Sequence, residues 1–151
     1  MQEDKMDKLR LEVGSADYLR AASCYIRMNV FVLERKLDIR DEFDQNDKEE
    51  TIYSVLFDGT VPVATARFLP LTKNAARITR VATLKNYRGK QLGSKVIKGL
   101  ERVAVVSGFK KILIHSELTA AGFYEKLGYV RTGTVYKEDG VSCTTLSKNL
   151  S

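Results

Sequence analysis

The stretch that decides the fold covers residues 78–94 and reads ITRVATLKNYRGKQLGS. A strand-like run leads into a basic loop containing Gly89 and Gly93, and the loop opens directly into a helical pattern. The first turn of a helix leaves backbone N–H groups unpaired and carries partial positive charge. Glycines also let the main chain approach a ligand closely. The stretch therefore predicts a site for a phosphate or diphosphate group.

The spacing of the glycines excludes two common kinds of phosphate-binding site. The chain has no GxxxxGK[ST] run and no GxGxxG after its first strand, which excludes a P-loop nucleotidase and an ordinary dinucleotide fold. A tight turn without any ligand stays open as an alternative on this segment alone.

The remaining hydrophobic patterns predict an alternation of strands and helices without a linker. Strands are expected at residues 9–13, 51–57, 61–69, 78–84, 110–114, 129–136 and 141–146, and helices at 16–33, 92–104 and 120–127. The apolar run at 112–114 is typical of a strand in a parallel pair, which is buried on both faces. We expect one α/β (α+β) domain over residues 1–151, with a mixed sheet and helices on its faces.

Composition restricts the class of protein. The chain has 151 residues, of which 44% are hydrophobic, and this length folds without a metal or disulfide. Cys24, Cys143 and His115 are its only cysteines and histidine, too few for a structural zinc site, so we expect reduced thiols and no metal. No apolar run approaches the roughly 20 residues of a membrane span. The polar segment Met1–Lys5 does not resemble a signal peptide, so we expect a cytoplasmic protein without a membrane partner.

Charge is unevenly spread over a chain whose net charge is +6. Residues 34–50 hold eight acids and four bases, whereas residues 85–111 hold eight bases and one acid. The basic segment raises the alternative of a nucleic-acid-binding module. Several of its lysines fall on the polar face of a predicted helix, and no aromatic platform accompanies them. We therefore expect no nucleic-acid partner.

Three motifs carry a family resemblance over residues 9–147. The run RGKQLG at 88–93 resembles the Q/R-x-x-G-x-G/A signature of the GNAT superfamily of acyl-CoA-dependent N-acetyltransferases, although Gln91 stands where the signature has glycine. The run AGFYEKLGY at 121–129 is similar to that family's A-x-x-F-Y-E-K-L-G-F helix. The chain also resembles the ElaA/YjcF-like subgroup of that family. This resemblance rests on His115 and on the runs VFVLER at 30–35, DEFD at 41–44 and EDGV at 138–141.

The resemblance implies a fold and a coenzyme site. The fold would be a mixed, mostly antiparallel sheet of six to seven strands flanked by helices, and the cosubstrate would be acetyl-CoA. The implied coenzyme contacts are Val81, Ala82 and Thr83 in the strand, and Arg88, Gly89, Lys90, Gln91, Leu92, Gly93 and Ser94 in the loop. The backbone N–H of Val81 or Ala82 would meet the developing negative charge on the carbonyl. Tyr124 would be the general acid toward the CoA sulfur. The family often forms dimers, so a homodimer stays open.

The general base stays open, because Thr79 and Arg80 stand where many relatives have a glutamate. Glu34 and His115 are the catalytic candidates, with Glu42 and Asp44 also in question. The acceptor is expected to be an amine of a small molecule or peptide, bound by Phe43, Asp44, Arg67 and Arg80. The acidic loop suits a cationic amine, whereas the two arginines suit a carboxylate, so an amino-acid-like acceptor would fit both. A non-catalytic acyl-CoA sensor of the same fold stays an alternative.

Overall fold

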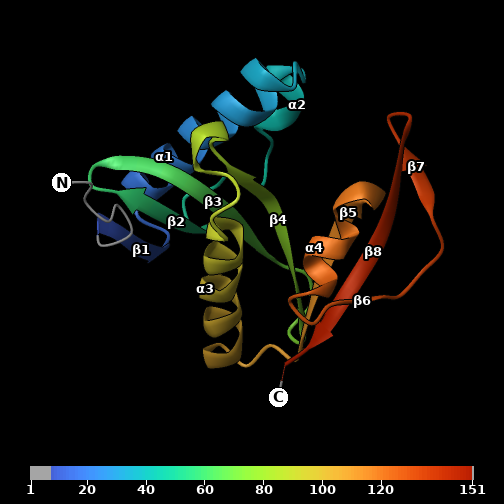
Figure 1. Cartoon of the computed structure of the whole chain (residues 1–151). Helices are drawn as coiled ribbons and strands as arrows, with labels where there is room; N and C mark the ends of the chain where they lie inside the picture. The colour runs from blue at the N-terminus through green and yellow to red at the C-terminus, as the bar shows by residue number, and fades with distance from the viewer. Residues whose placement is uncertain (1–7, 151) are drawn as a thin grey trace. The chain divides into compact units, whose positions relative to one another are not determined.

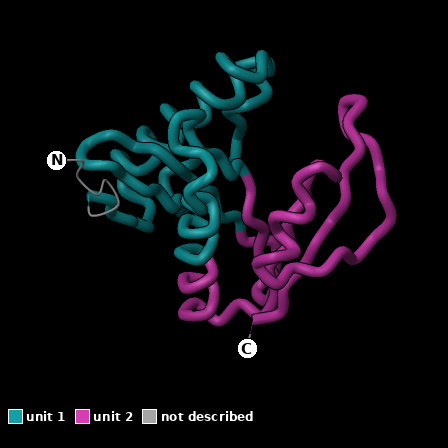
Figure 2. Tube along the Cα trace, viewed as in Figure 1, with its two compact units in different colours: residues 1–69, 80–100 teal, residues 70–79, 101–151 magenta. Residues whose placement is uncertain are grey.

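The computed structural model describes residues 8–150 and divides into two compact units, coloured separately in Figure 2. The first unit contains the chain up to residue 69 together with residues 80–100, and the second contains residues 70–79 and the chain from residue 101. The strands are β1 (Leu9–Gly14), β2 (Ile52–Asp58), β3 (Val61–Pro70), β4 (Ala75–Thr83), β5 (Lys111–Glu117), β6 (Val130–Arg131), β7 (Tyr136–Glu138) and β8 (Val141–Asn149). The helices are α1 (Asp17–Arg27), η2 (Met28–Glu34), α2 (Ile39–Glu42), η3 (Lys85–Tyr87), α3 (Leu92–Val106), η4 (Leu118–Ala120) and α4 (Ala121–Glu125).

The first unit is built on antiparallel strands. β1 pairs with β2 from Leu9↔Asp58 to Gly14↔Tyr53, and β2 pairs with β3 through a hairpin that closes at Asp58↔Val61. Figure 1 shows the three strands side by side. Gly59 supplies the positive φ of 63° that this two-residue turn requires at its first position.

Alternate residues of β2 face different helices, because side chains along a strand point to opposite faces. Tyr53, Val55 and Phe57 join a buried cluster with α1 and η2, whose members there are Leu19, Ala22, Ile26 and Val30. Ser54 faces α3 instead. A Cβ added at Gly99 of α3 would lie 3.0 Å from the Ser54 hydroxyl, so glycine permits this close approach. The unit therefore has helices on both faces of its strands.

The end of β4, which precedes the predicted phosphate loop, packs into the same buried cluster as α1, η2 and β2. Ala82 is one of its buried members, and Leu84 and Phe31 pack against it. The Leu84 N–H donates to the Val63 carbonyl over 2.9 Å. The loop that follows is thus anchored at its first residue.

In the second unit, β5 is the central strand. The first residues of β4 pair with β5 in parallel, from Ala75↔Lys111 to Arg77↔Leu113, which confirms the expectation from the apolar run. β5 and β8 pair antiparallel, and β6 and β7 pair with β8. Helix α4 is closed by Gly128, whose φ is 98°. Lys148 fixes this turn by donating to the Leu127 carbonyl over 2.8 Å and to Glu101 over 3.2 Å.

The strands follow the order β1-β2-β3-β4-β5-β8-β6, with β7 also paired to β8. The predicted mixed, mostly antiparallel sheet is confirmed, but residues 8–150 form eight strands rather than six or seven. The single strand expected at 129–136 is wrong. Within residues 129–138, only Val130–Arg131 and Tyr136–Glu138 form strands paired with β8, because the segment around Gly133 leaves the sheet. No helix within residues 8–150 is long and apolar enough to cross a membrane. The prediction on Met1–Lys5 lies outside the described residues.

Candidate active site

The predicted phosphate loop leaves β4 through η3 and enters the 15-residue helix α3 at Leu92. Gly89 has a φ of 78°, and Gln91 has a φ of 62°, a left-handed conformation that is uncommon for a residue with a side chain. The structure therefore adopts at Gln91 the backbone geometry that the glycine of the signature would supply. The segment from Arg88 to Gln91 is exposed, and a Cβ built at Gly89 meets no atom within 4 Å. The loop surface is open to a ligand.

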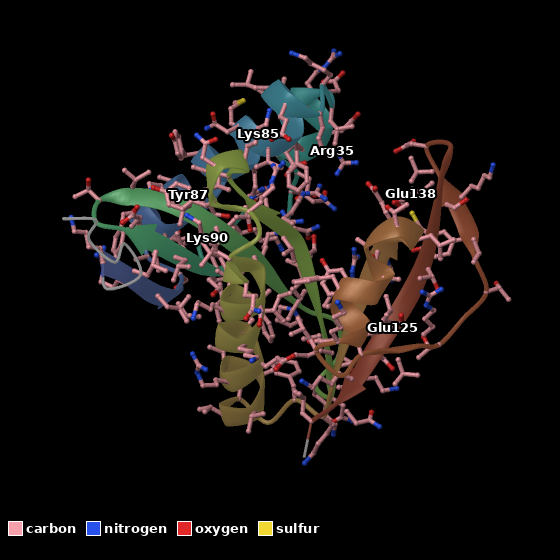
Figure 3. All side chains as sticks on the ribbon, viewed as in Figure 1. Arg35, Lys85, Tyr87, Lys90, Glu125 and Glu138 are labelled. Carbon is pink, nitrogen blue, oxygen red and sulfur yellow. The ribbon has the colours of Figure 1, made fainter. Side chains whose placement is uncertain are left out.

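Basic and aromatic side chains flank the loop, and Figure 3 shows Lys85, Tyr87 and Lys90 together there. The Lys90 ammonium lies 5.6 Å from the centre of the Tyr87 ring. The Tyr87 hydroxyl donates to Asp58 over 2.6 Å, and this hydrogen bond raises the pKa of Tyr87. The tyrosine is thus held in place beneath the ammonium group of Lys90.

Arg88 forms an ion pair and a backbone hydrogen bond within the first unit. Its guanidinium donates to both oxygens of Glu34 over 2.7 Å, and its Nε donates to the Thr83 carbonyl over 3.0 Å. The hydrogen bonds from Arg88 lower the pKa of Glu34. A carboxylate with a lowered pKa is a weaker proton acceptor, so this pairing argues against Glu34 as the general base.

A pocket of about 230 Å³ lies beside this pair. It is lined by Asn29, Val30, Glu34, Leu84, Lys85, Asn86 and Tyr87. Its wall from Asn29 to Glu34 belongs to η2, a π-helical continuation of α1. Widened helical turns of this kind are frequent at functional sites. The helix expected at 16–33 is therefore present, but its last two turns are wider than the sequence pattern predicts.

Three acids of the loop after the first helix are paired with three arginines, two of which are buried. Three guanidinium groups and three carboxylates meet there and form what we call the arginine cluster: Arg27, Arg67, Arg80, Glu42, Asp44 and Asp47. Arg27 is fully buried and donates to Glu42 and Asp47 over 2.7–3.0 Å. The loop thus presents far less negative charge than its composition indicates. Glu42, whose sequence context suggested a solvated acid, is only 5% exposed.

The pKa values of the three acids differ because burial and ion pairing oppose each other. Burial raises the pKa of Glu42, and its ion pairs with Arg80 and Arg27 do not reverse this. Burial is outweighed at Asp47 by hydrogen bonds from Arg27 and Tyr53, so the pKa of Asp47 lies well below its usual range. Burial is outweighed at Asp44 by Arg67 and by the Asn46 N–H, so the pKa of Asp44 is also lowered. Asp44 and Asp47 therefore stay ionised at neutral pH.

Arg80 joins the cluster from an unusual backbone position. Its φ is 56° within strand β4, directly before Val81. The side chain donates to Asp44 over 3.1 Å and to the Glu42 carbonyl over 3.2 Å. Bulky residues hold such conformations only where the surroundings enforce them, often at ligand sites. Phe43 lies in the same loop, and its ring stacks on the Arg27 guanidinium at 4.9 Å.

Two predicted residues belong to the second unit. Tyr124 of α4 is 9% exposed, and burial raises its pKa to about 12. Its ring meets Tyr129 edge-on at 6.3 Å, and Tyr129 in turn donates to Glu101 over 2.7 Å. His115 lies on the exposed side of β5, edge-on to Tyr136 at 6.5 Å. Burial, followed by the charge of Arg77, lowers the pKa of His115, against an opposing effect of Glu138.

Comparison with known proteins identifies the family. The sequence profile of the acetyltransferase (GNAT) family matches residues 16–129. The chain belongs to the GNAT family. An uncharacterized acetyltransferase from Streptococcus pyogenes is 47% identical over 110 residues, which cover 73% of this chain and 75% of that protein. A crystal structure assigned as an N-acetyltransferase from Lactobacillus plantarum is 35% identical, has a TM-score of 0.91, and covers 95% of this chain and 99% of its own.

ElaA from Escherichia coli shares the fold. Its crystal structure is 21% identical, has a TM-score of 0.80, and covers 93% of this chain and 99% of its own. Within this GNAT chain, the loop from Arg88 to Ser94 and the strand residues Val81 to Thr83 form one continuous segment of the first unit. Their contacts to a coenzyme stay a prediction, as do the roles of Tyr124 and His115.

Sequence reasoning missed three residues that organise the site: Arg27, Asp47 and Tyr53. Arg27 falls on the buried face of α1, eight residues after Leu19 and four after Ser23. A basic residue within an apolar stripe was the available signal. Asp47 accepts hydrogen bonds from Arg27 and from the Tyr53 hydroxyl, but nothing local in its sequence distinguishes it from its exposed neighbours.

Proposed function

We propose that this GNAT protein transfers an acetyl group from acetyl-CoA to a primary amine of a small molecule or peptide. The observation that carries the proposal is the loop from Arg88 to Ser94. Its residues from Arg88 to Gln91 are exposed, with left-handed backbone at 89 and 91, and residues 92–94 form the first turn of α3. Unpaired amides and the helix dipole at such a turn bind a diphosphate, and CoA carries a doubly charged one.

The residues of the loop fit this role chemically. The amides from Gly89 to Ser94 are the proposed diphosphate ligands, and Lys90 adds charge from its place over Tyr87. Arg88 contributes in another way, since its ion pair with Glu34 joins the loop to η2. The strand segment Val81–Thr83 is the proposed partner of the pantetheine arm, with one of its N–H groups stabilising the developing oxyanion.

The chemistry requires a proton donor for the departing thiolate. Tyr124 stays protonated at neutral pH, because burial raises its pKa to about 12. It is a weaker acid than an exposed tyrosine, so we assign it the donation of a hydrogen bond and finally a proton to the sulfur as negative charge develops there.

The chemistry also requires a base for the amine. Between the two candidates, the contacts favour His115. His115 lies on the exposed side of β5 and its imidazole, with a lowered pKa, is neutral at pH 7 and has a nitrogen that can accept a proton, whereas both oxygens of Glu34 already accept hydrogen bonds from Arg88. We therefore propose His115 as the base.

Thiol release tests the proposal. The protein is mixed with acetyl-CoA and a panel of amino acids, peptides, polyamines and aminoglycosides, and free CoA is measured. Acetyl-CoA at 100 times its dissociation constant should also stabilise the fold by about 2.7 kcal/mol. Tyr124→Phe should keep this stabilisation and lose turnover. Tyr25→Phe, which alters an exposed tyrosine of α1, should keep both.

The outcomes separate the alternatives. Stabilisation by acetyl-CoA without thiol release for any amine would identify a non-catalytic sensor. Absence of stabilisation would contradict the coenzyme site itself.

A further inference from the structure

The arginine cluster contains one acid that differs from the other two. Asp44 is 30% exposed, whereas Glu42 is 5% exposed and Asp47 is 10% exposed. Glu42 and Asp47 both neutralise Arg27, which is fully buried and which these two acids must keep paired. Asp44 makes no ion pair with Arg27 among the described residues, so it can leave without exposing that charge.

The carboxylate of Asp44 lies between two guanidinium groups. Arg67 donates to its two oxygens over 3.0 and 3.4 Å, and Arg80 donates to Oδ2 over 3.1 Å. Paired guanidinium groups of this kind are the usual protein partners of a carboxylate, because their planar N–H donors match its geometry. The arrangement is a carboxylate-binding site that the chain fills with its own side chain.

Both arginines keep a partner when Asp44 moves away. Arg67 lies 3.1 Å from Asp47, and Arg80 lies 3.1 Å from Glu42. A carboxylate that arrives from solution restores the balance of three positive and three negative groups. The exchange therefore replaces one ion pair by an equivalent one and leaves no buried charge alone.

The place of Arg80 in the chain connects this site with the proposed chemistry. Arg80 directly precedes Val81, the first residue of the strand segment proposed to bind the pantetheine arm and the developing oxyanion. An acceptor whose carboxylate is held by Arg80 is therefore bound next to that segment.

We propose that Arg67 and Arg80 form the carboxylate subsite for the acceptor, and that an amino-acid-like acceptor displaces Asp44 from it. This inference rests on the proposed function, since it names the acceptor class of the same enzyme. Asp44 thus acts as an internal competitor, and the apparent affinity for the acceptor is reduced by the fraction of time that Asp44 fills the subsite.

Calorimetric binding with matched ligand pairs tests the proposal. The probes are the common amino acids and the amines that lack only their carboxylate, such as phenylalanine and phenethylamine. Asp44→Asn keeps an oxygen that can accept from the Asn46 N–H and removes the competing charge. If Asp44 fills the subsite about nine-tenths of the time, this variant should bind the carboxylate member of a pair about tenfold more tightly. The amine member should bind as it does to the wild type.

The control is Glu49→Gln, which removes the same charge from an exposed position of the same loop. It should leave both members of each pair unchanged. Arg80→Gln keeps the test available if Asp44→Asn does not fold, and it should weaken the binding of carboxylate members by at least about tenfold.

Three results would overturn the proposal: no gain in Asp44→Asn, an equal gain for amines without a carboxylate, or the same gain in Glu49→Gln. Absence of binding by every amino acid in both the wild type and Asp44→Asn would also overturn it. A parallel titration with acetyl-CoA separates the two proposals. Coenzyme binding and thiol release without carboxylate selectivity would refute only the subsite, whereas loss of coenzyme binding would refute the proposed function.

Discussion

Replacing Arg27 by methionine should destabilise the protein more than any other single change in the arginine cluster. Arg27 is fully buried, and four hydrogen bonds join it to two residues, Glu42 and Asp47. Methionine fills a similar length of side chain but leaves three carboxylates facing two guanidinium groups, those of Arg67 and Arg80. Breaking a buried pair in this way costs about 3–5 kcal/mol. For a domain of this size, that corresponds to a fall in Tm of roughly 6–20 °C.

Urea denaturation and thermal melting, both followed by circular dichroism, measure the loss. The control is Arg20→Met in the same helix. Arg20 pairs with Asp17, whose side chain is 87% exposed, so its removal should cost less than about 1 kcal/mol. Adding Glu42→Gln to Arg27→Met should recover part of the stability, since it removes the negative charge that is left in excess. A loss below about 1 kcal/mol for Arg27→Met, or one equal to that of Arg20→Met, would refute the reasoning.

Three further predictions concern the backbone and pH. Gln91→Gly removes a left-handed conformation that costs about 1–2 kcal/mol but adds about 0.5–1 kcal/mol of chain entropy to the unfolded state. The free energy of unfolding measured in urea should therefore stay the same or rise. Lys95→Gly in α3 is the control and should lower it by about 1 kcal/mol. Gly99→Ala places a methyl group 3.0–3.1 Å from side-chain atoms of β1 and β2, so it should lower the free energy of unfolding in urea by about 1–3 kcal/mol. Gly122→Ala is the control, because its methyl group meets no atom within 4 Å, and it should lower that free energy by nothing. The folded pKa of Asp47 is depressed, so the stability that Asp47 contributes is present above its unfolded pKa of about 3.9 and is lost as the pH falls below it. The urea midpoint of the wild type should therefore fall between pH 4 and pH 2, and Asp47→Asn should make this fall shallower. An equally steep fall in the variant would contradict the prediction.

The loop and the helices could be predicted because their signals are local. The segment before Leu92 combines glycine, basic residues and a helix start within a few positions, and helix α3 shows an unbroken apolar stripe that ends before Gly108. Local spacing also located α4 and its closing glycine. The family motifs fall on these same elements, so both kinds of reasoning agreed.

The arginine cluster could not be predicted, because its pairs join residues far apart in the chain. Arg27 meets Asp47 across 20 positions, and Arg80 meets Asp44 across 36. Composition alone indicated an excess of acids in this loop, and only the tertiary structure shows that three of them are matched by arginines from α1, β3 and β4. The interruption between β6 and β7 was missed for a similar reason, since pairing with β8 decides which of those residues form strands.

The central claim is that main-chain amides from Gly89 to Ser94 hold the diphosphate of the coenzyme. Backbone ¹⁵N–¹H spectra recorded during separate titrations with CoA and with pantetheine test it most directly, because pantetheine lacks the diphosphate. The account predicts that these amide resonances shift with CoA and stay in place with pantetheine. Shifts that are absent with CoA, or that are the same with both ligands, would contradict it.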